Sequence, residues 1–186
     1  MRVIAGSAGG VRLAVPKCSI RPTMDRVKAA IFSSLGDAII GAHVLDLFAG
    51  TGALGIEALS RGAASAVFVE DDLRIAETTK KNLAVTKLKG RVRNQDVFDF
   101  LQGTPTQYEF EIIFADPPYE KRHHGEFYTE KLLNNESLPH MLEPGGIFVL
   151  ETRPKETVSG LKLWRVIRQK QYGATEVLFL RKSAIA

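Results

Sequence analysis

The sequence predicts an α/β fold with a doubly wound, mostly parallel sheet, and three observations support this prediction. From residue 43 onward, short apolar runs alternate with helical patterns, which is typical of strand–helix–strand units. The first of these runs leads into a glycine-rich turn, 50–55, that opens a helix. The chain has 186 residues, of which 45% are hydrophobic and 25% are charged, as in a globular domain with a sizeable core.

The N-terminal residues 1–40 are expected to form a β-hairpin and a helix that precede the main sheet. Two short apolar runs, 3–5 and 11–15, flank a glycine-rich segment, which is a hairpin signal. A helical pattern follows, for which Thr23 is a candidate N-cap. Residues 41–186 are expected to form the core sheet, so that the whole chain is one domain.

Strands and helices are expected to alternate through the rest of the chain. Most of the expected strands are short apolar runs, 91–94 is a short piece with one apolar residue, and the expected helices have apolar residues on one face. The last two strands flank a Tyr-Gly-Ala turn and are expected to form an antiparallel pair that closes one edge of the sheet. The expected strands are 44–48, 66–70, 91–94, 110–115, 147–151, 163–171 and 175–180, and the expected helices are 53–61, a helix from 71 or 72, 97–101 and 127–133.

Acidic residues lie in or just after four of the expected strands. Asp46 lies within the first strand and Glu70 ends the second, whereas Asp96 and Asp116 follow the third and fourth. Ligands of open parallel sheets bind beyond the carboxyl ends of the strands, so these acids are expected to line one site. Each acid alone is more often a helix N-cap or a solvated loop residue, but their joint placement favours a role in binding.

The turn after the first strand carries the G-x-G-x-x-G pattern of a dinucleotide site at Gly50, Gly52 and Gly55. A small NAD-dependent oxidoreductase would place its pyrophosphate over this turn. Asp46 would direct a carboxylate into the same space, and two negative groups in a low-dielectric pocket repel by roughly several kcal/mol. S-adenosylmethionine (SAM) carries an ammonium and a sulfonium, and the N–H groups of the turn could hold its carboxylate, so Asp46 favours SAM as the cofactor.

The segment Asp116-Pro117-Pro118-Tyr119 follows the fourth strand, beside the expected methyl group. Its two prolines remove two backbone donors and stiffen the loop, although a simple strand-ending turn is the alternative interpretation. The amine of a nucleobase is a poor nucleophile because its lone pair is delocalised into the ring. A carboxylate and a proline carbonyl that accept its N–H bonds would favour the attacking form. Tyr119 offers a flat face for a base taken out of its stack, and this chemistry needs no metal.

The charge distribution favours an anionic partner. The formal net charge is +4, and six basic residues with one acid fall within 1–28, whereas 80–93 has six basic residues and no acid. Such clusters suit contact with a phosphate backbone, although a solvated helix face is an equally good interpretation of either one. The single cysteine leaves no disulfide framework and no cysteine-rich metal site. We find neither a signal peptide nor a segment of membrane-spanning length, so we expect a cytoplasmic protein without membrane contact.

Two motifs resemble those of amino-group nucleic-acid methyltransferases of the SAM-dependent, Rossmann-like class. They are the Asp-Pro-Pro-Tyr segment and Asp-Leu-Phe-Ala-Gly-Thr-Gly at 46–52. The segments 21–27 and 54–62, together with the opening hairpin, resemble the bacterial RsmD-type methyltransferases, which modify the N2 amine of a guanine in small-subunit (16S) ribosomal RNA. The resemblance covers essentially the whole chain. It implies a seven-stranded sheet whose final strand is antiparallel and inserted next to its neighbour.

The resemblance also implies a role for each candidate site residue. Asp116 and Pro117 would bind the target amine, and Tyr119 would stack on its base. Glu70 would hold the ribose of SAM, and Asp96 would meet the adenine. The implied catalytic residues are Asp116, Pro117 and Tyr119, the implied substrate-binding residues are Arg21, Thr23 and Pro118, and the implied cofactor-binding residues are Asp46, Phe48, Gly50, Gly52, Glu70, Asp96 and Val97.

Three alternatives stay open from the sequence. Related enzymes use Asp or Asn at the position of Asp116, so this residue does not separate guanine from adenine, and another nucleic-acid amino methyltransferase is the first alternative. The short chain without a target-recognition domain disfavours sequence-specific work on DNA. A small NAD-dependent oxidoreductase and a catalytically silent RNA-binding module are the others. The expected partner is ribosomal RNA in a small subunit or its assembly intermediate, and the expected state is a monomer.

Overall fold

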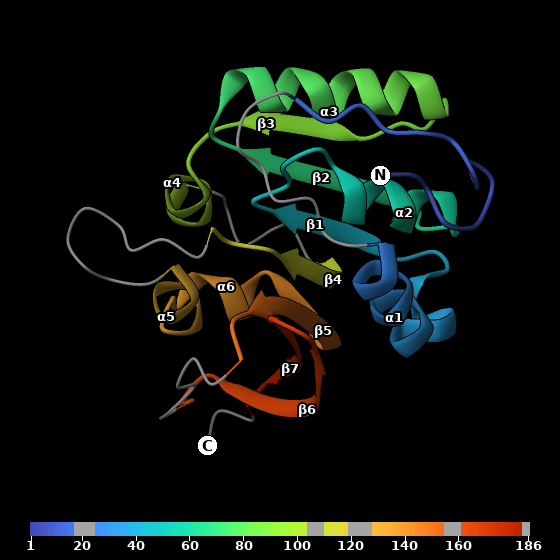
Figure 1. Ribbon diagram of the computed structural model, residues 1–186. Coiled ribbons are helices and arrows are strands. Elements are labelled where there is room, and N and C mark those ends of the chain that lie inside the picture. Colours follow the sequence, from blue (N-terminus) through green and yellow to red (C-terminus); the bar gives the residue numbers. More distant parts are fainter. Residues whose placement is uncertain (17–24, 104–109, 119–127, 155–160, 184–186) are drawn as a thin grey trace.

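The computed structural model contains one seven-stranded sheet with the order β3-β2-β1-β4-β5-β7-β6 (Figure 1). The structure describes residues 1–16, 25–103, 110–118, 128–154 and 161–183. The strands are β1 (His43–Leu47), β2 (Ser65–Glu70), β3 (Arg91–Asn94), β4 (Phe110–Ala115), β5 (Leu142–Thr152), β6 (Trp164–Tyr172) and β7 (Thr175–Lys182). The helices are α1 (Asp25–Leu35), the 3-10 helix η1 (Gly36–Ile39), α2 (Ala53–Ser60), α3 (Leu73–Thr86), α4 (Val97–Gly103), α5 (Tyr128–Leu133) and α6 (Ser137–His140).

The direction of the strands confirms the predicted doubly wound sheet. Strands β1 to β5 pair in parallel, and β7 pairs antiparallel with both β5 and β6. The last strand is therefore inserted between its two predecessors, as the resemblance implied. The strand order reverses between β1 and β4, so the carboxyl ends of these two strands form the switch point where ligands of such sheets bind. In Figure 1 the arrows of β1 and β2 point toward the side on which α4 and α5 lie.

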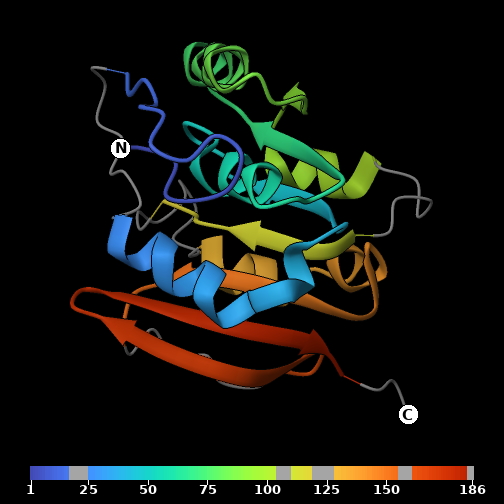
Figure 2. The same cartoon turned by 90° about the vertical axis from the view of Figure 1, so that its right-hand side faces the viewer.

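Two apolar cores cover the two faces of the sheet. One contains side chains of α1, α2 and α3, and the other contains side chains of α4, α5 and α6. Because successive side chains of a strand alternate between faces, Val44 and Asp46 of β1 face the α2 layer, whereas Leu45 and Leu47 pack in the other core. In Figure 2, α1 lies along the β6–β7 pair, where Ser34 accepts hydrogen bonds from two basic side chains of β6. Among the described helices, none has the length and apolar character needed to cross a membrane.

The predicted N-terminal hairpin forms only in part. The two predicted runs pair through one isolated antiparallel bridge, between Arg2 and Arg12, and the N–H of Val3 donates to the carbonyl of Val11, but no longer ladder forms. This segment, residues 1–16, which we call the N-terminal strap, also donates several backbone N–H groups to side chains of α2. The acceptors are the Glu57 carboxylate and the Ser60 hydroxyl. Because Ile4 and Ala5 donate to Glu57, they do not extend the pairing into a longer ladder.

Smaller differences occur at element ends. The first strand ends at Leu47 rather than Phe48, because Phe48 adopts a positive φ of 56° and starts the turn. Strand β5 begins at Leu142, earlier than expected, and the four-residue helix α6 is too short to show a periodic pattern. Asp72 caps α3 by accepting the N–H groups of two residues in the first turn, which confirms the predicted start of that helix. The proposed cap Thr23 lies outside the described residues.

Candidate functional site

The turn between β1 and α2 has a backbone that only glycine suits at several positions. Gly50 and Gly52 have φ values of 56° and 78°, in the left-handed region that other residues rarely adopt. A Cβ atom at Gly52 would also lie 2.7 Å from Cγ2 of Thr79, and one at Gly55 would lie 2.3 Å from Cε1 of Phe68. The glycine pattern therefore allows both the sharp turn and the close packing of α2 on the sheet. We call residues 48–52 the glycine turn.

Asp46 lies under the start of α2 and is almost completely buried. Its side chain belongs to a residue that is 2% exposed, and its Oδ2 accepts the N–H of Gly55 at 2.8 Å. The pKa of Asp46 is raised to about 8, mainly by burial and in part by the charges of Asp116 and Glu70, whereas the hydrogen bond from Gly55 opposes the shift. Parallel pairing places the ends of β1, β2 and β4 side by side, and the charges of Asp116 and Glu70 act on Asp46. We call these three acids, which are three of the four grouped from the sequence, the acidic edge.

Glu70 ends β2 and holds the glycine turn in place. Its Oε2 accepts the N–H of Gly50 at 2.8 Å, and its Oε1 accepts the N–H of Asp72 at 3.1 Å. Burial raises the pKa of Glu70 to about 7. Both carboxylate oxygens thus already accept one backbone hydrogen bond, and each has further acceptor capacity for a ligand hydroxyl. Glu70 therefore has a structural role in the turn that the sequence did not suggest, and its contact with a ribose stays a prediction.

The remaining candidates are distributed around the same strand ends. Asp96 caps α4, because its Oδ1 accepts the N–H of Phe98 at 2.8 Å, and Val97 is 2% exposed. Asp116 is half-buried after β4, Pro117 is buried and Pro118 is exposed. In the described part of the chain, no group of three or more His, Cys, Asp or Glu side chains could hold a metal ion. The candidates Arg21, Thr23 and Tyr119 lie outside the described residues.

An aromatic cluster, which the sequence did not reveal, packs beside the glycine turn. The ring of Phe48 makes an edge contact with the ring of Tyr128, at 5.4 Å between centroids, and lies 6.3 Å from Phe98. Nζ of Lys131 lies 4.1 Å from the centroid of the Phe98 ring. Phe48 therefore connects the turn to α4 and α5, and these aromatic rings border the acidic edge on the opposite face from Asp46.

Two polar residues of α3 also hold the glycine turn, and sequence reasoning did not identify them. Oγ1 of Thr79 donates to the carbonyl of Gly50 at 2.7 Å, and Nδ2 of Asn82 donates to the carbonyl of Thr51 at 2.9 Å. The Asn82 amide also exchanges two hydrogen bonds with the backbone of Ala14 in the N-terminal strap. Both side chains belong to residues that are at most 1% exposed. The sequence signal that could have identified Thr79 and Asn82 is that both are polar residues on the apolar face of α3.

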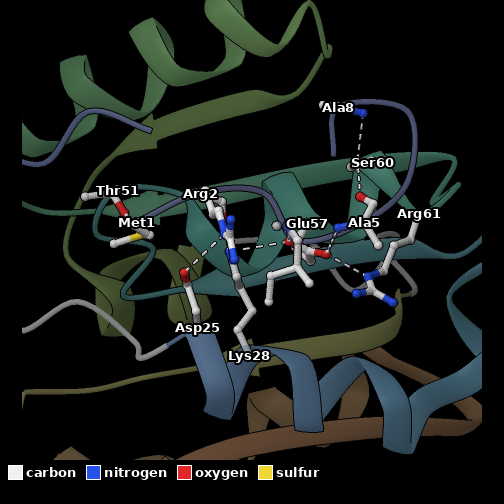
Figure 3. Close-up of polar contacts among 12 residues, drawn as sticks. Met1, Arg2, Ala5, Ala8, Asp25, Lys28, Thr51, Glu57, Ser60 and Arg61 are labelled. Atoms are coloured by element: carbon white, nitrogen blue, oxygen red, sulfur yellow. Dashed lines mark hydrogen bonds and ion pairs between the residues drawn. The ribbon is translucent and has the colours of Figure 1, made fainter. Parts of the chain in front are cut away.

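A second buried polar cluster lies near the other end of α2 (Figure 3). The Glu57 carboxylate is fully buried and accepts the N–H groups of Ile4 and Ala5 and a hydrogen bond from Nε of Arg61. Nζ of Lys28 lies 3.3 Å from the same carboxylate, and burial lowers the pKa of Lys28 while the charge of Glu57 opposes that shift. This cluster joins α1, α2 and the N-terminal strap.

Comparisons with known proteins identify the family. The family model described as "Conserved hypothetical protein 95" matches residues 1–181. Ribosomal RNA small subunit methyltransferase D of Haemophilus influenzae is 34% identical over 177 residues, which cover 93% of this chain and 89% of the relative. The solved structure of a hypothetical protein from Thermus thermophilus superposes with a TM-score of 0.83 at 30% identity, over 97% of this chain and 99% of that one.

A third similar protein has been solved with ligands. The 16S rRNA N2 methyltransferase RsmC of T. thermophilus, in complex with AdoMet and guanosine, superposes with a TM-score of 0.64 at 26% identity. The match covers 91% of this chain and 45% of that one. Membership of a methyltransferase family sets aside the oxidoreductase interpretation of the glycine pattern. The chain belongs to the family described as conserved hypothetical protein 95, the RsmD family of methyltransferases, and has the Rossmann-like methyltransferase fold.

Proposed function

We propose that the chain transfers a methyl group from SAM to the exocyclic N2 amine of a guanine in small-subunit (16S) ribosomal RNA. The observation that carries the proposal is the acidic edge, where Asp46, Glu70 and Asp116 meet around the glycine turn, with Asp116 opening an Asp-Pro-Pro-Tyr segment. The name of the H. influenzae relative and the guanosine bound to RsmC support the choice of reaction and base.

The residues of the acidic edge fit SAM. The described neighbours whose charges act on Asp46 are acids, so a ligand that carries an ammonium and a sulfonium would offset an unfavourable concentration of negative charge. Asp46, Phe48, Gly50 and Gly52 would hold the methionine part. Glu70 would accept the ribose hydroxyls. For the adenine, Asp96 would accept the exocyclic amine and the Val97 backbone would provide a further contact. SAM, when bound, supplies an electrophilic methyl group on its sulfonium.

Asp116 and Pro117 would act on the target amine. The Asp116 carboxylate accepts one N–H bond of the amine and stabilises the positive charge that develops on nitrogen as the N–C bond forms and the C–S bond breaks. Pro117 has no N–H group, so its peptide unit offers only a carbonyl acceptor for the second N–H. Both residues directly follow the rigid strand β4, which favours a preorganised geometry.

Three proposed substrate contacts lie outside the described residues. Tyr119 would stack on the flipped base, and Arg21 and Thr23 would form part of the pocket floor between cofactor and substrate. Pro118, which is exposed, would border the same pocket. The substrate would be RNA within a small ribosomal subunit or an assembly intermediate, and the enzyme would act as a monomer.

The proposal is tested by substitution of the acceptor. In Asp116→Ala, methyl transfer should fall at least about 10²-fold while SAM affinity stays within about three-fold, because the acceptor acts on the amine. The assay incubates protein with labelled SAM, ribosomal RNA and partly assembled small subunits, and the modified base is identified by mass spectrometry. Retained turnover in Asp116→Ala would contradict the mechanism, and N6-methyladenine as the product would favour the adenine alternative.

A further inference from the structure

A buried acid, Glu151, lies beside Asp116 at the carboxyl end of the sheet. In the parallel pairing of β4 with β5, Ala115 is opposite Leu150, so the next residues of the two strands are Asp116 and Glu151. Neighbouring strands lie about 4.8 Å apart, which sets the separation of the two backbones at this point. Glu151 is 6% exposed. A carboxylate therefore lies one strand away from the residue proposed to bind the target amine.

The alternation of side chains places Glu151 on the same face of the sheet as Asp46. Two residues earlier, Val149 packs with Phe114 in the core under α1 and α2, whereas Leu150 packs in the opposite core. Since alternate side chains of a strand share a face, Glu151 continues the Val149 row. Asp46 lies on this same face, and the charge of Asp116 acts on it.

The backbone around Glu151 is held on both sides. Strand β5 pairs with β4 on one side and with β7 on the other, where Glu151 is opposite Val177. A side chain on an inner strand of a sheet is held more precisely than one on a loop. This precision suits a residue that must distinguish similar bases. Asp116, by contrast, begins the loop that follows β4.

We propose that Glu151 selects guanine by accepting the N1–H of the target base while Asp116 accepts its N2 amine; this inference rests on the proposed function above. The Watson–Crick edge of guanine presents N1–H and the N2 amine side by side, and both are donors. Adenine presents a lone pair at N1, which a carboxylate would repel. Asp116 accepts an amine from either base, so Glu151 supplies the discrimination that Asp116 alone does not.

The inference is tested with two RNA substrates that differ at the target base. One carries guanine, and the other carries 2-aminopurine, which keeps the amine at C2 but has no N1–H. For the wild-type protein, kcat/KM should fall about 10²-fold or more with 2-aminopurine, because a buried acceptor is left without its donor. For Glu151→Ala, kcat/KM with guanine should be well below the wild-type value. Replacement of guanine by 2-aminopurine should lower kcat/KM of this variant by at most about three-fold more. Glu151→Gln keeps an acceptor oxygen and the side-chain volume, so its guanine preference should be intermediate.

Glu176→Gln provides the matched control. Glu176 is another buried acid of the sheet, 7% exposed on β7, but its Oε1 accepts a hydrogen bond from Gln169 and its side chain lies on the opposite face. The Glu176→Gln variant should prefer guanine over 2-aminopurine as strongly as the wild-type protein does. Equal preferences in wild type and both Glu151 variants would overturn the role of Glu151 while leaving guanine methylation intact. Absence of guanine methylation by the wild-type protein would instead overturn the proposed function.

Discussion

Two buried acids, Asp46 of β1 under the start of α2 and Glu57 in the second half of α2, have opposite electrostatic surroundings. Glu57 is fully buried and lies within 3.3 Å of two cationic groups, on Lys28 and Arg61. Asp46 is nearly as deeply buried, but the charged groups that act on it are the acids Asp116 and Glu70. One acid is compensated within the protein, and the other is not compensated by any described side chain.

This difference supports our proposal that Asp46 binds the cofactor, whereas Glu57 has a structural role. A compensated buried carboxylate stabilises the folded protein through its partners, and removal of one member leaves the others uncompensated. A buried carboxylate whose charged neighbours are also acids destabilises the folded protein in its charged form. Its charge becomes favourable only when a cationic ligand binds beside it. Strongly shifted pKa values in such a setting are typical of functional sites. Both acids are buried, so burial alone does not distinguish the acid that we propose to bind a ligand from the structural one.

The largest expected effect concerns stability. Glu57→Ala should lower the free energy of unfolding by about 3–5 kcal/mol, because it leaves the Lys28 ammonium buried without its acid and frees two strap N–H groups. Urea denaturation measures this change. The control is Glu77→Gln, which removes an exposed ion pair with Lys80 and should cost less than about 1 kcal/mol. A loss below about 1 kcal/mol in Glu57→Ala would remove the contrast between the two buried acids.

The next effect concerns cofactor affinity. Asp46→Asn should weaken SAM binding about 10–100-fold, since the amide no longer offers a negative charge, while its oxygen still accepts the N–H of Gly55. The free energy of unfolding without SAM should not decrease at about pH 8.5, because the substitution removes a buried charge rather than a compensated one. Calorimetric titration with SAM and denaturation at that pH measure the two quantities. Unchanged SAM affinity would show that Asp46 is a structural acid as well.

A smaller effect is expected from the neutral hydrogen bonds of the turn. Thr79→Val removes the bond to the Gly50 carbonyl and keeps the side-chain shape, so SAM affinity should fall about five-fold, as for the loss of one net hydrogen bond. Thr78→Val is the matched control one residue away, because its hydroxyl bonds within the helix to Arg74, and it should leave affinity unchanged. Equal effects of both substitutions would point to the helix rather than the turn.

The smallest effect is a pH dependence that only the acidic edge should show. The folded-state pKa values of Asp46 and Glu70 are raised to about 8 and about 7, so without SAM these groups retain protons that a bound cation would displace. SAM affinity should therefore rise by a few-fold from about pH 6 to about 7.5, with proton release. Titrations in buffers of different ionisation enthalpy count the released protons, and Asp46→Asn should reduce the change of SAM affinity with pH.

In the absence of SAM, the same raised pKa values predict that the free energy of unfolding falls as pH rises from about 4 toward about 8.

Local patterns were sufficient to predict most of the sheet. Strands β3 and β4 begin and end at the predicted residues. Strand β4 is an apolar run between polar segments, whereas β3 was predicted from its place between two helical patterns. The placement of Asp46, Glu70 and Asp116 at one edge followed from the rule that parallel strands share their carboxyl ends. These predictions depend on residues close together in sequence or on a general property of parallel sheets.

The features that the sequence did not predict depend on contacts between residues far apart in the chain. The strap N–H groups bind Glu57 and Ser60, which lie more than fifty residues away, and no local pattern distinguishes these partners from a hairpin strand. Asn82 likewise links the strap to the glycine turn through backbone carbonyls that the sequence does not mark. The positive φ of Phe48 could not be inferred either, since the residue type favours an extended strand.

The insertion of β7 between β5 and β6 also sets an order of events during protein synthesis. Strand β6 leaves the ribosome before β7, yet in the finished sheet it pairs with β7 alone. Until residues 175–182 emerge, β5 lacks the partner strand on one of its edges and β6 has no partner strand at all. Open edges are the surfaces through which incomplete sheets associate with one another. The β5–β7–β6 region is therefore where a slowed or interrupted synthesis would expose the chain to aggregation.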